Sequence, residues 1–200
     1  LALDREGLEN PVMAKWAGIV EEAGIPVSWQ DGDAFLHSKF VVVDDRLVWT
    51  GSWNATINDT YRNNNNLLRI TVQPIVDNYA AEFEQMAGGA FGSGKDLQTP
   101  HPLIRLDEAT VENDFSPRDR VSSRVVNWVD RARQSVDVLA FAFTDDDLGD
   151  VLIERHRAGV PVRVVFEARN AEGVGSEYGR LRRNGLQVLE DGNCYTMHHK

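Results

Sequence analysis

Short apolar runs alternate with amphipathic stretches along most of the chain. Five runs are rich in β-branched residues and each is short enough for one strand: 40–44, 47–51, 66–72, 136–143 and 160–166. Five other stretches repeat their apolar residues three or four positions apart, as helices do: 13–24, 74–88, 121–132, 145–159 and 176–185. Strands that alternate with helices predict a layered α/β fold.

Turn and helix-end signals support this division. Residues 44–46, Asp-Asp-Arg, predict a tight turn between the first two strands. The stretch 145–159 has its acids in the first turn and its bases in the last, which favours a helix through its dipole. A helix N-terminus therefore explains the acidic run 145–147 better than a metal site does. We expect no metal and no cofactor.

An internal repeat divides the chain. Residues 24–39 align with residues 185–200 without a gap, and a helical pattern followed by a short apolar run occurs in both copies. Four matched pairs are identical: Gly24 and Gly185, Val27 and Val188, His37 and His198, Lys39 and Lys200. The repeat predicts two copies of one domain in tandem, with the second half of the first copy at 1–95 and the first half of the second at 109–200. The Gly- and Pro-containing stretch 96–108 is the expected linker.

Composition limits the classes of protein that fit. The chain has 200 residues, 42% of them hydrophobic and 26% charged, which is typical of a globular protein. Its uncharged apolar runs are too short to predict a membrane span. A single cysteine excludes an internal disulfide framework. The net charge of −10 disfavours non-specific binding to a polyanion. Since the chain begins with Leu1 and stops within a repeated motif, we expect a segment of a longer protein, so its localisation stays open.

The most informative stretch follows the pattern HxKx4Dx6GSxN. It contributes six residues of interest: His37, Lys39, Asp44, Gly51, Ser52 and Asn54. If 37–39 is extended, the side chains of His37 and Lys39 point the same way, toward one ligand. Ser52 and Asn54 follow on the next strand and its end. An imidazole, an ammonium, an amide and a hydroxyl that converge on one point suit a phosphate group.

At these residues the sequence resembles the phospholipase D superfamily. Its motif is complete at 37–54, and a second copy begins at His198-His199-Lys200. The resemblance implies a phospholipase D-like α-β-α sandwich with a pseudo-two-fold tandem repeat, each half giving one motif to the site. It also implies metal-independent phosphodiester chemistry through a covalent phosphohistidine.

By position, the resemblance assigns a role to each motif residue. The catalytic residues would be His37, Lys39, His198 and Lys200, with His37 as the nucleophile and His198 as the acid. Asn54 and Ser52 would bind the substrate phosphate. Structural support of the motif is expected from Asp44, Gly51 and Asn65.

Two departures from the family pattern matter. Lys200 is the last residue, so the aspartate and the GSxN of the second motif lie outside this sequence. Members often carry a glutamate in an N-x-E-N stretch after the first motif, and here Asn65 has that position. An amide can orient an imidazole, but it does not stabilise an imidazolium as a carboxylate does.

The favoured function is phospholipid hydrolysis or phosphatidyl transfer of the cardiolipin-synthase kind, in a prokaryotic protein. Peripheral membrane contact is compatible with it. The first alternative is an endonuclease that takes nucleic acid as its partner, for which six arginines could line a groove: Arg118, Arg120, Arg124, Arg180, Arg182 and Arg183. The second is an inactive scaffold, which would require a lost catalytic residue, and His37, Lys39, His198 and Lys200 are all present.

Overall fold

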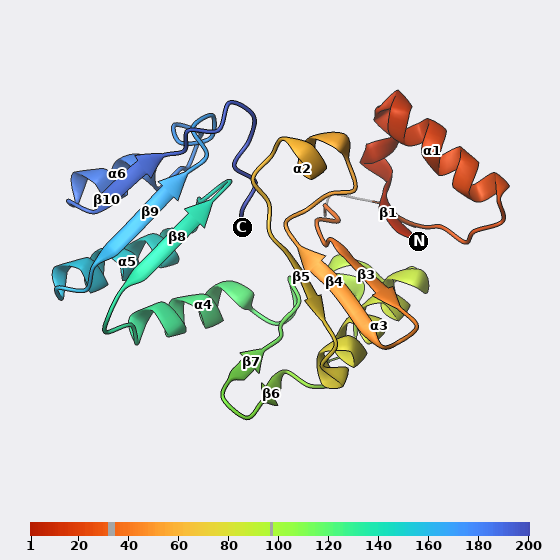
Figure 1. Cartoon of the computed structure of the whole chain (residues 1–200), viewed down its shortest axis with the longest axis horizontal. Helices are drawn as coiled ribbons and strands as arrows, with labels where there is room; N and C mark the ends of the chain where they lie inside the picture. The colour runs from red at the N-terminus through yellow and green to blue at the C-terminus, as the bar shows by residue number, and fades with distance from the viewer. Residues whose placement is uncertain (32–34, 97) are drawn as a thin grey trace. The chain divides into compact units, whose positions relative to one another are not determined.

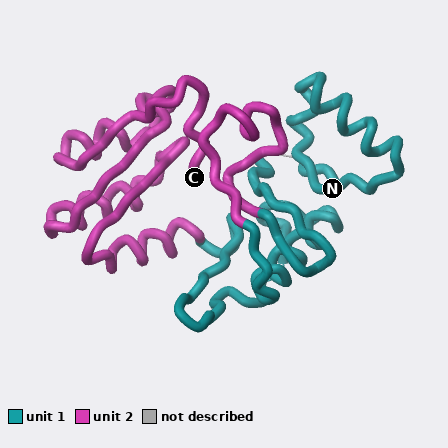
Figure 2. The backbone as a smooth tube through the Cα atoms, viewed as in Figure 1, with its two compact units in different colours: residues 1–49, 69–120 teal, residues 50–68, 121–200 magenta. Residues whose placement is uncertain are grey.

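The computed structural model describes residues 1–31, 35–96 and 98–200. The chain forms two compact units, each built from two segments (Figure 2). Unit 1 comprises residues 1–49 and 69–120, and unit 2 comprises residues 50–68 and 121–200. The mixed α/β composition predicted from the hydrophobic pattern is confirmed in both (Figure 1).

Unit 1 contains a parallel pair of short strands, β1 (Ala2–Asp4) and β2 (Ser28–Gln30), connected through helix α1 (Pro11–Glu22). A second sheet has the order β3-β4-β5. Its strands are Phe40–Val43, Leu47–Gly51 and Leu67–Ile70, the last two running across the division between the units.

Helix α3 (Gln73–Ala87) supplies much of the apolar core of unit 1. The fully buried Val48 of β4 lies in one cluster with Ile75 and Val76 of α3. The expected helix 74–88 is thus confirmed to within one residue at each end. Proline at its start fits, because the first helical turn needs no N–H from that residue.

Unit 2 is built on a parallel sheet of order β10-β9-β8. Its strands are β8 (Val136–Ala140), β9 (Val162–Phe166) and β10 (Gln187–Glu190). Its helices are α2 (Ile57–Tyr61), α4 (Val121–Asp130), α5 (Asp146–Arg157) and α6 (Tyr178–Arg183). Leu152 of α5 and Leu181 of α6 are fully buried against Val164 of β9. This helix-covered parallel sheet is the expected result of strands alternating with helices.

One expectation needs correction, and two further features were not predicted. Strand β3 begins at Phe40, so His37 and Lys39 precede it in a segment without regular structure. The predicted strand 40–44 is only half-buried, because its side chains alternate between the α3 side and the open side of the sheet. The stretch 96–108 contains strand β6 (Leu103–Arg105), which pairs with β7 (Thr110–Glu112), and Ile104 of β6 is buried in the core of unit 1. Its role as a linker stays a prediction.

Candidate active site

The residues predicted for the site fall into both units. His37, Lys39 and Asp44 belong to unit 1, whereas the others belong to unit 2. Those of unit 2 are Gly51, Ser52, Asn54, Asn65, His198 and Lys200. Within unit 2 the structure brings Ser52, Asn65, His198 and Lys200 into one hydrogen-bonded chain.

The turn before the GSxN motif has the geometry that its sequence predicts. Asp44 and Asp45 have φ values of 53° and 49°, and the Arg46 N–H donates to the Val43 carbonyl at 3.0 Å. Two successive positive φ angles define the type of turn that matches the twist of a β-hairpin. Asp44 therefore lies in the turn between β3 and β4, and its predicted support of the motif stays a prediction.

Gly51 allows the chain to pass very close to its neighbour. A Cβ atom added at this position would lie 2.2 Å from the backbone oxygen of Asn66. The Ser52 N–H donates to that same oxygen at 3.0 Å. A side chain at position 51 would therefore separate the segments that carry Ser52 and Asn65.

Ser52 is fully buried and organises Asn65. Its hydroxyl donates to Oδ1 of Asn65 at 2.8 Å and accepts the Asn66 N–H at 3.1 Å. The Nδ2 group of Asn65 donates to the Asp59 carbonyl at 3.1 Å, which fixes the orientation of the amide. Ser52 thus donates its hydroxyl proton to Asn65, and its predicted role in binding the substrate phosphate stays a prediction.

The segment that carries His198 is held by backbone bonds on two sides. The His198 N–H donates to the Asn64 carbonyl, and the Asn64 N–H to the Thr196 carbonyl, both at 2.8 Å. On the other side the Phe141 N–H donates to the His199 carbonyl at 2.9 Å. Figure 1 shows this C-terminal segment between the end of β8 and the chain that follows α2.

A buried carboxylate also holds this segment. Glu167 is only 2% exposed, and its Oε2 accepts the Met197 N–H at 2.9 Å. From its place at the end of the apolar run 160–166, Glu167 was expected at most to line a substrate pocket, and not to bind the segment of His198. A charged residue at the end of an apolar strand was the available signal, because such a residue needs polar partners when it is buried.

The imidazole of His198 has different neighbours at its two nitrogens. Nδ1 lies 3.0 Å from Oδ1 of Asn65, an acceptor, which places a proton on Nδ1. Nε2 lies 3.0 Å from Nζ of Lys200. The edge of the ring packs against Phe141, with centroids 5.0 Å apart, and Lys200 Nζ lies 4.4 Å from the centroid of the same phenyl ring. Nε2 and the ammonium thus form one pair of groups suited to a phosphate oxygen.

Asp59 is a site residue that the sequence did not suggest. Its Oδ2 lies 3.5 Å from His198 Nδ1 and accepts the backbone N–H and the Nδ2 group of Asn54. Burial raises the pKa of Asp59, but the hydrogen bonds donated by Asn54 and Asn63 and the charge of His198 outweigh it, so the pKa lies below its ordinary value. The sequence shows an acid six residues before Asn65, but this spacing alone does not predict a contact with His198.

Asn54 supports this carboxylate as well as being expected to bind phosphate. Its backbone N–H donates to Asp59 Oδ2 at 2.7 Å, and one N–H of its side-chain amide donates to the same oxygen. An amide nitrogen carries two protons, so the second stays available to a substrate. The predicted role of Asn54 in binding phosphate remains a prediction.

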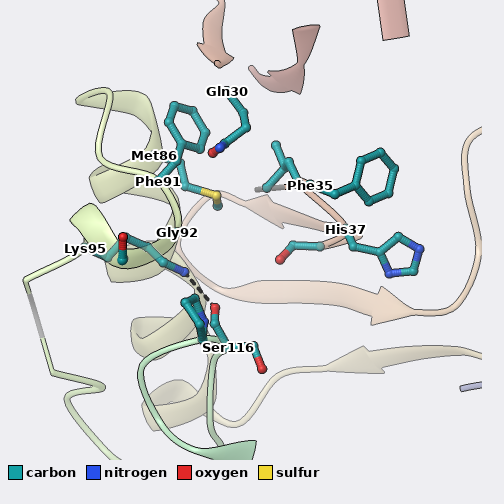
Figure 3. Close-up of a pocket in the computed structure, with 12 residues that line it drawn as sticks. Gln30, Phe35, His37, Met86, Phe91, Gly92, Lys95 and Ser116 are labelled. Atoms are coloured by element: carbon teal, nitrogen blue, oxygen red, sulfur yellow. Dashed lines mark hydrogen bonds between the residues drawn. The ribbon is translucent and has the colours of Figure 1, made fainter. Parts of the chain in front are cut away.

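The first motif lies beside a cavity in unit 1. Lys39 Nζ donates to the backbone carbonyl of His37 at 2.8 Å, so the two residues are neighbours although the segment is not a strand. His37 also lines a cavity of about 540 Å³ together with Phe35, Met86 and Phe91. Figure 3 shows the His37 imidazole extending away from Met86. The catalytic roles of His37 and Lys39 stay predictions.

Three of the six arginines proposed for a nucleic-acid groove interact with neighbouring side chains. Arg180 pairs with Asp150 and with Glu177, and Arg182 stacks on the ring of Tyr178 and donates to its hydroxyl. Arg118 pairs with Asp119 at 3.3 Å. The nucleic-acid alternative stays a prediction, because these contacts concern three of its six arginines.

Two features are absent from the part of the chain that the structure describes. No helix there is both long enough and apolar enough to cross a membrane. Over the same residues, no cluster of three or more His, Cys, Asp or Glu side chains could hold a metal ion.

An α/β fold that holds a histidine next to a lysine is compatible with the resemblance to the phospholipase D superfamily. Comparison with protein families gives the same answer, because the family described as "cardiolipin synthase, PLD-like domain" matches residues 3–87 and 125–200. The chain belongs to this family. The tandem boundaries at 95 and 109 stay a prediction.

Two similar proteins are both named mitochondrial cardiolipin hydrolase. The chain is 35% identical over 78 residues to the mitochondrial cardiolipin hydrolase of Chlamydomonas reinhardtii, covering 39% of this chain and 35% of that protein. It is 40% identical over 78 residues to the human mitochondrial cardiolipin hydrolase, covering 39% of this chain and 31% of that protein. The chain therefore spans about a third of the length of these relatives.

A solved structure shares the fold. Polyphosphate kinase from Porphyromonas gingivalis superposes with a TM-score of 0.59 at 15% identity, over 94% of this chain and 31% of the kinase. At that identity the likeness concerns the fold alone, and it confirms the expected α/β class.

Proposed function

We propose that this chain carries the catalytic residues of a phospholipase D-like phosphodiesterase that acts on a phospholipid. The observation that carries the proposal is the arrangement of His198, with Nδ1 held by Asn65 and Nε2 next to the ammonium of Lys200. This leaves Nε2 as the nitrogen for proton transfer and puts a cation where a phosphate oxygen would need one. Family membership and relatives named cardiolipin hydrolase support a phospholipid as the substrate.

The reaction has two displacement steps. In the first, an unprotonated imidazole nitrogen of His37 attacks phosphorus, and a P–N bond forms as the P–O bond to the leaving alcohol breaks. The leaving oxygen takes a proton from Nε2 of His198. Lys39, Lys200 and the free N–H of the Asn54 amide hold the phosphate oxygens, whose negative charge they offset.

The second step returns the enzyme to its starting form. Nε2 of His198 takes a proton from water while the water oxygen attacks phosphorus. The new P–O bond forms, the P–N bond breaks, and His37 regains its electron pair. An alcohol in the place of water would give phosphatidyl transfer by the same route, so the acceptor decides between hydrolysis and transfer.

The test uses the protein at its full natural length, as wild type and as His37→Ala, His198→Ala and His156→Ala. Each is given bis-p-nitrophenyl phosphate with EDTA, and p-nitrophenol release is followed. Cardiolipin vesicles and single-stranded DNA are then offered separately. We expect steady turnover by wild type, a loss of about 10³-fold or more in the first two variants, and cleavage of the lipid.

His156 is the matched control, because it lies in the last turn of α5, outside the site. His156→Ala should keep wild-type turnover. Equal activity in all four proteins would mean that another group does the chemistry. Cleavage of DNA and not of lipid would replace the proposed substrate class, and no turnover by wild type would contradict the proposed reaction.

A further inference from the structure

A carboxylate lies beside the imidazole of His198 where the sequence led us to expect only an amide. Asp59 comes from the one-turn helix α2, and its Oδ2 is 3.5 Å from Nδ1 of His198. The side chain of Asp59 is 4% exposed and that of His198 is 12% exposed. Two opposite charges so close and so shielded from solvent interact more strongly than they would on the surface.

The carboxylate is held in the form that can act as a counter-charge. Oδ1 accepts the amide of Asn63 at 2.5 Å, and Oδ2 accepts the backbone N–H of Asn54 at 2.7 Å. The side-chain amide of Asn54 donates to Oδ2 as well. Three N–H donors stabilise a carboxylate against protonation, and the pKa of Asp59 is lowered accordingly.

The position of Asp59 is fixed independently of His198. The backbone N–H of Asp59 donates at 3.1 Å to the hydroxyl of Thr56, the residue that caps α2. This bond fixes the backbone at Asp59. The Asp59 carbonyl accepts Nδ2 of Asn65, whose Oδ1 faces the same imidazole nitrogen. One network therefore sets both the amide and the carboxylate next to Nδ1.

We propose that Asp59 is a positioning residue for His198, holding the proton on Nδ1 and stabilising the imidazolium in place of a glutamate at position 65. This inference rests on the proposed function of His198 as the acid of the first step. It explains how an imidazolium can be stabilised without a glutamate at position 65, because the Asn65 amide orients the ring and the neighbouring Asp59 carboxylate supplies the negative charge.

Several neighbours of His198 differ from Asp59 in their effect on the charge of the ring. The ammonium of Lys200 lies 3.0 Å from Nε2 and disfavours a second positive charge on the ring. Phe141 and Asn65 carry no charge. Glu167 binds the backbone of Met197, one residue away. Asp59, whose Oδ2 lies 3.5 Å from Nδ1, is thus a carboxylate that offsets Lys200 at the ring, and its removal should lower the pKa of His198.

The test compares Asp59→Asn with Asp147→Asn in the full-length protein. Asp147 is an exposed residue of α5, so the control removes the same charge outside the site. NMR of 15N-labelled histidine gives the pKa of the His198 ring in each protein. We expect a fall of about one unit or more in Asp59→Asn, and none in Asp147→Asn.

A rescue variant separates charge from structure. The double variant Asp59→Asn with Asn65→Asp places a carboxylate at position 65, where the side-chain oxygen already faces Nδ1 of His198. The pKa of His198 should recover in this double variant. In the lipid assay, the falling limb of kcat/KM at high pH should move to lower pH in Asp59→Asn by the same amount, because the acid form of His198 is lost earlier.

The outcomes distinguish this inference from the proposed function. An unchanged His198 pKa in Asp59→Asn would overturn the role of Asp59, whatever the enzyme does. Absence of turnover by wild type would refute the proposed function and leave the NMR comparison valid. If Asp59→Asn does not fold, the 15N shifts of the wild-type ring decide, since a ring protonated on Nε2 and bare at Nδ1 would contradict the proposal.

Discussion

Gly51→Ala should disrupt the backbone approach on which the second unit's site depends. The added Cβ would lie 2.2 Å from the Asn66 oxygen, 2.9 Å from the Asn66 carbonyl carbon and 3.0 Å from the Leu67 Cα. Real Cβ contacts essentially never fall below 3.0 Å, so the oxygen must move by at least 0.8 Å (3.0 − 2.2). All three atoms belong to the backbone, so no side chain can rotate out of the way.

The cost follows from this geometry. Overpacking against a fixed neighbour costs about 1–3 kcal/mol, and the φ of 156° at Gly51 adds backbone strain for any residue with a side chain. We therefore expect the free energy of unfolding to fall by about 2–4 kcal/mol. Urea denaturation followed by circular dichroism measures this change.

Gly18→Ala is the matched control. Gly18 lies inside α1, and a Cβ there would meet nothing within 4 Å. Alanine is the better helix former, so this variant should be more stable by about 0.5–1 kcal/mol. Equal urea midpoints for Gly51→Ala and wild type would refute the close approach, and with it the account of how Ser52 reaches Asn65.

Three further changes test the packing and electrostatics of unit 2. Leu152→Ala, at a fully buried position, should cost about 2–5 kcal/mol in thermal or urea unfolding, whereas Leu189→Ala, at a position 54% exposed, should cost less than about 0.5 kcal/mol. Asp145→Ala removes the cap that accepts the Leu148 N–H at 2.9 Å and should cost about 0.5–2 kcal/mol at pH 7. The hydrogen bonds from Ser122 and Leu148 lower the pKa of Asp145, so its contribution is complete above the unfolded-state pKa and is lost as pH falls through the folded-state value. The stability gap between wild type and Asp145→Ala should therefore close in acid, and a gap that is constant with pH would contradict this explanation.

The helices and longer strands were predictable because their patterns are local. Helix α5 begins after the cap Asp145, has acids in its first turn and is followed by Gly159, and these residue types are visible in the sequence. Gly159 has a φ of 87° in the structure. Strands β1, β6 and β7 have three residues each, too few for a period of two to be recognised. The alternating burial of β3 was hidden because both its faces are apolar.

Site residues could be predicted only where they belong to the motif, to its repeat or to the family pattern. The repeat identified His198 and Lys200, and the family pattern pointed to Asn65 as the neighbour of a histidine, at a separation of 133 residues. Asp59 was missed because nothing local distinguishes it from other acids in polar segments. Its partners Asn54 and Asn63 lie nearby in sequence, but its contact with His198 depends on the folded chain.

The division of labour between the two histidines can be measured directly. A p-nitrophenyl ester needs little help from an acid, so His198→Ala should release about one p-nitrophenol per protein and then stall with phosphorus bound to His37. Rapid-quench kinetics would show this burst, and mass spectrometry would show the adduct on the peptide that contains His37. His37→Ala should show neither. A burst in His37→Ala, or an adduct on His198, would contradict the assignment of His37 as nucleophile and His198 as acid and base.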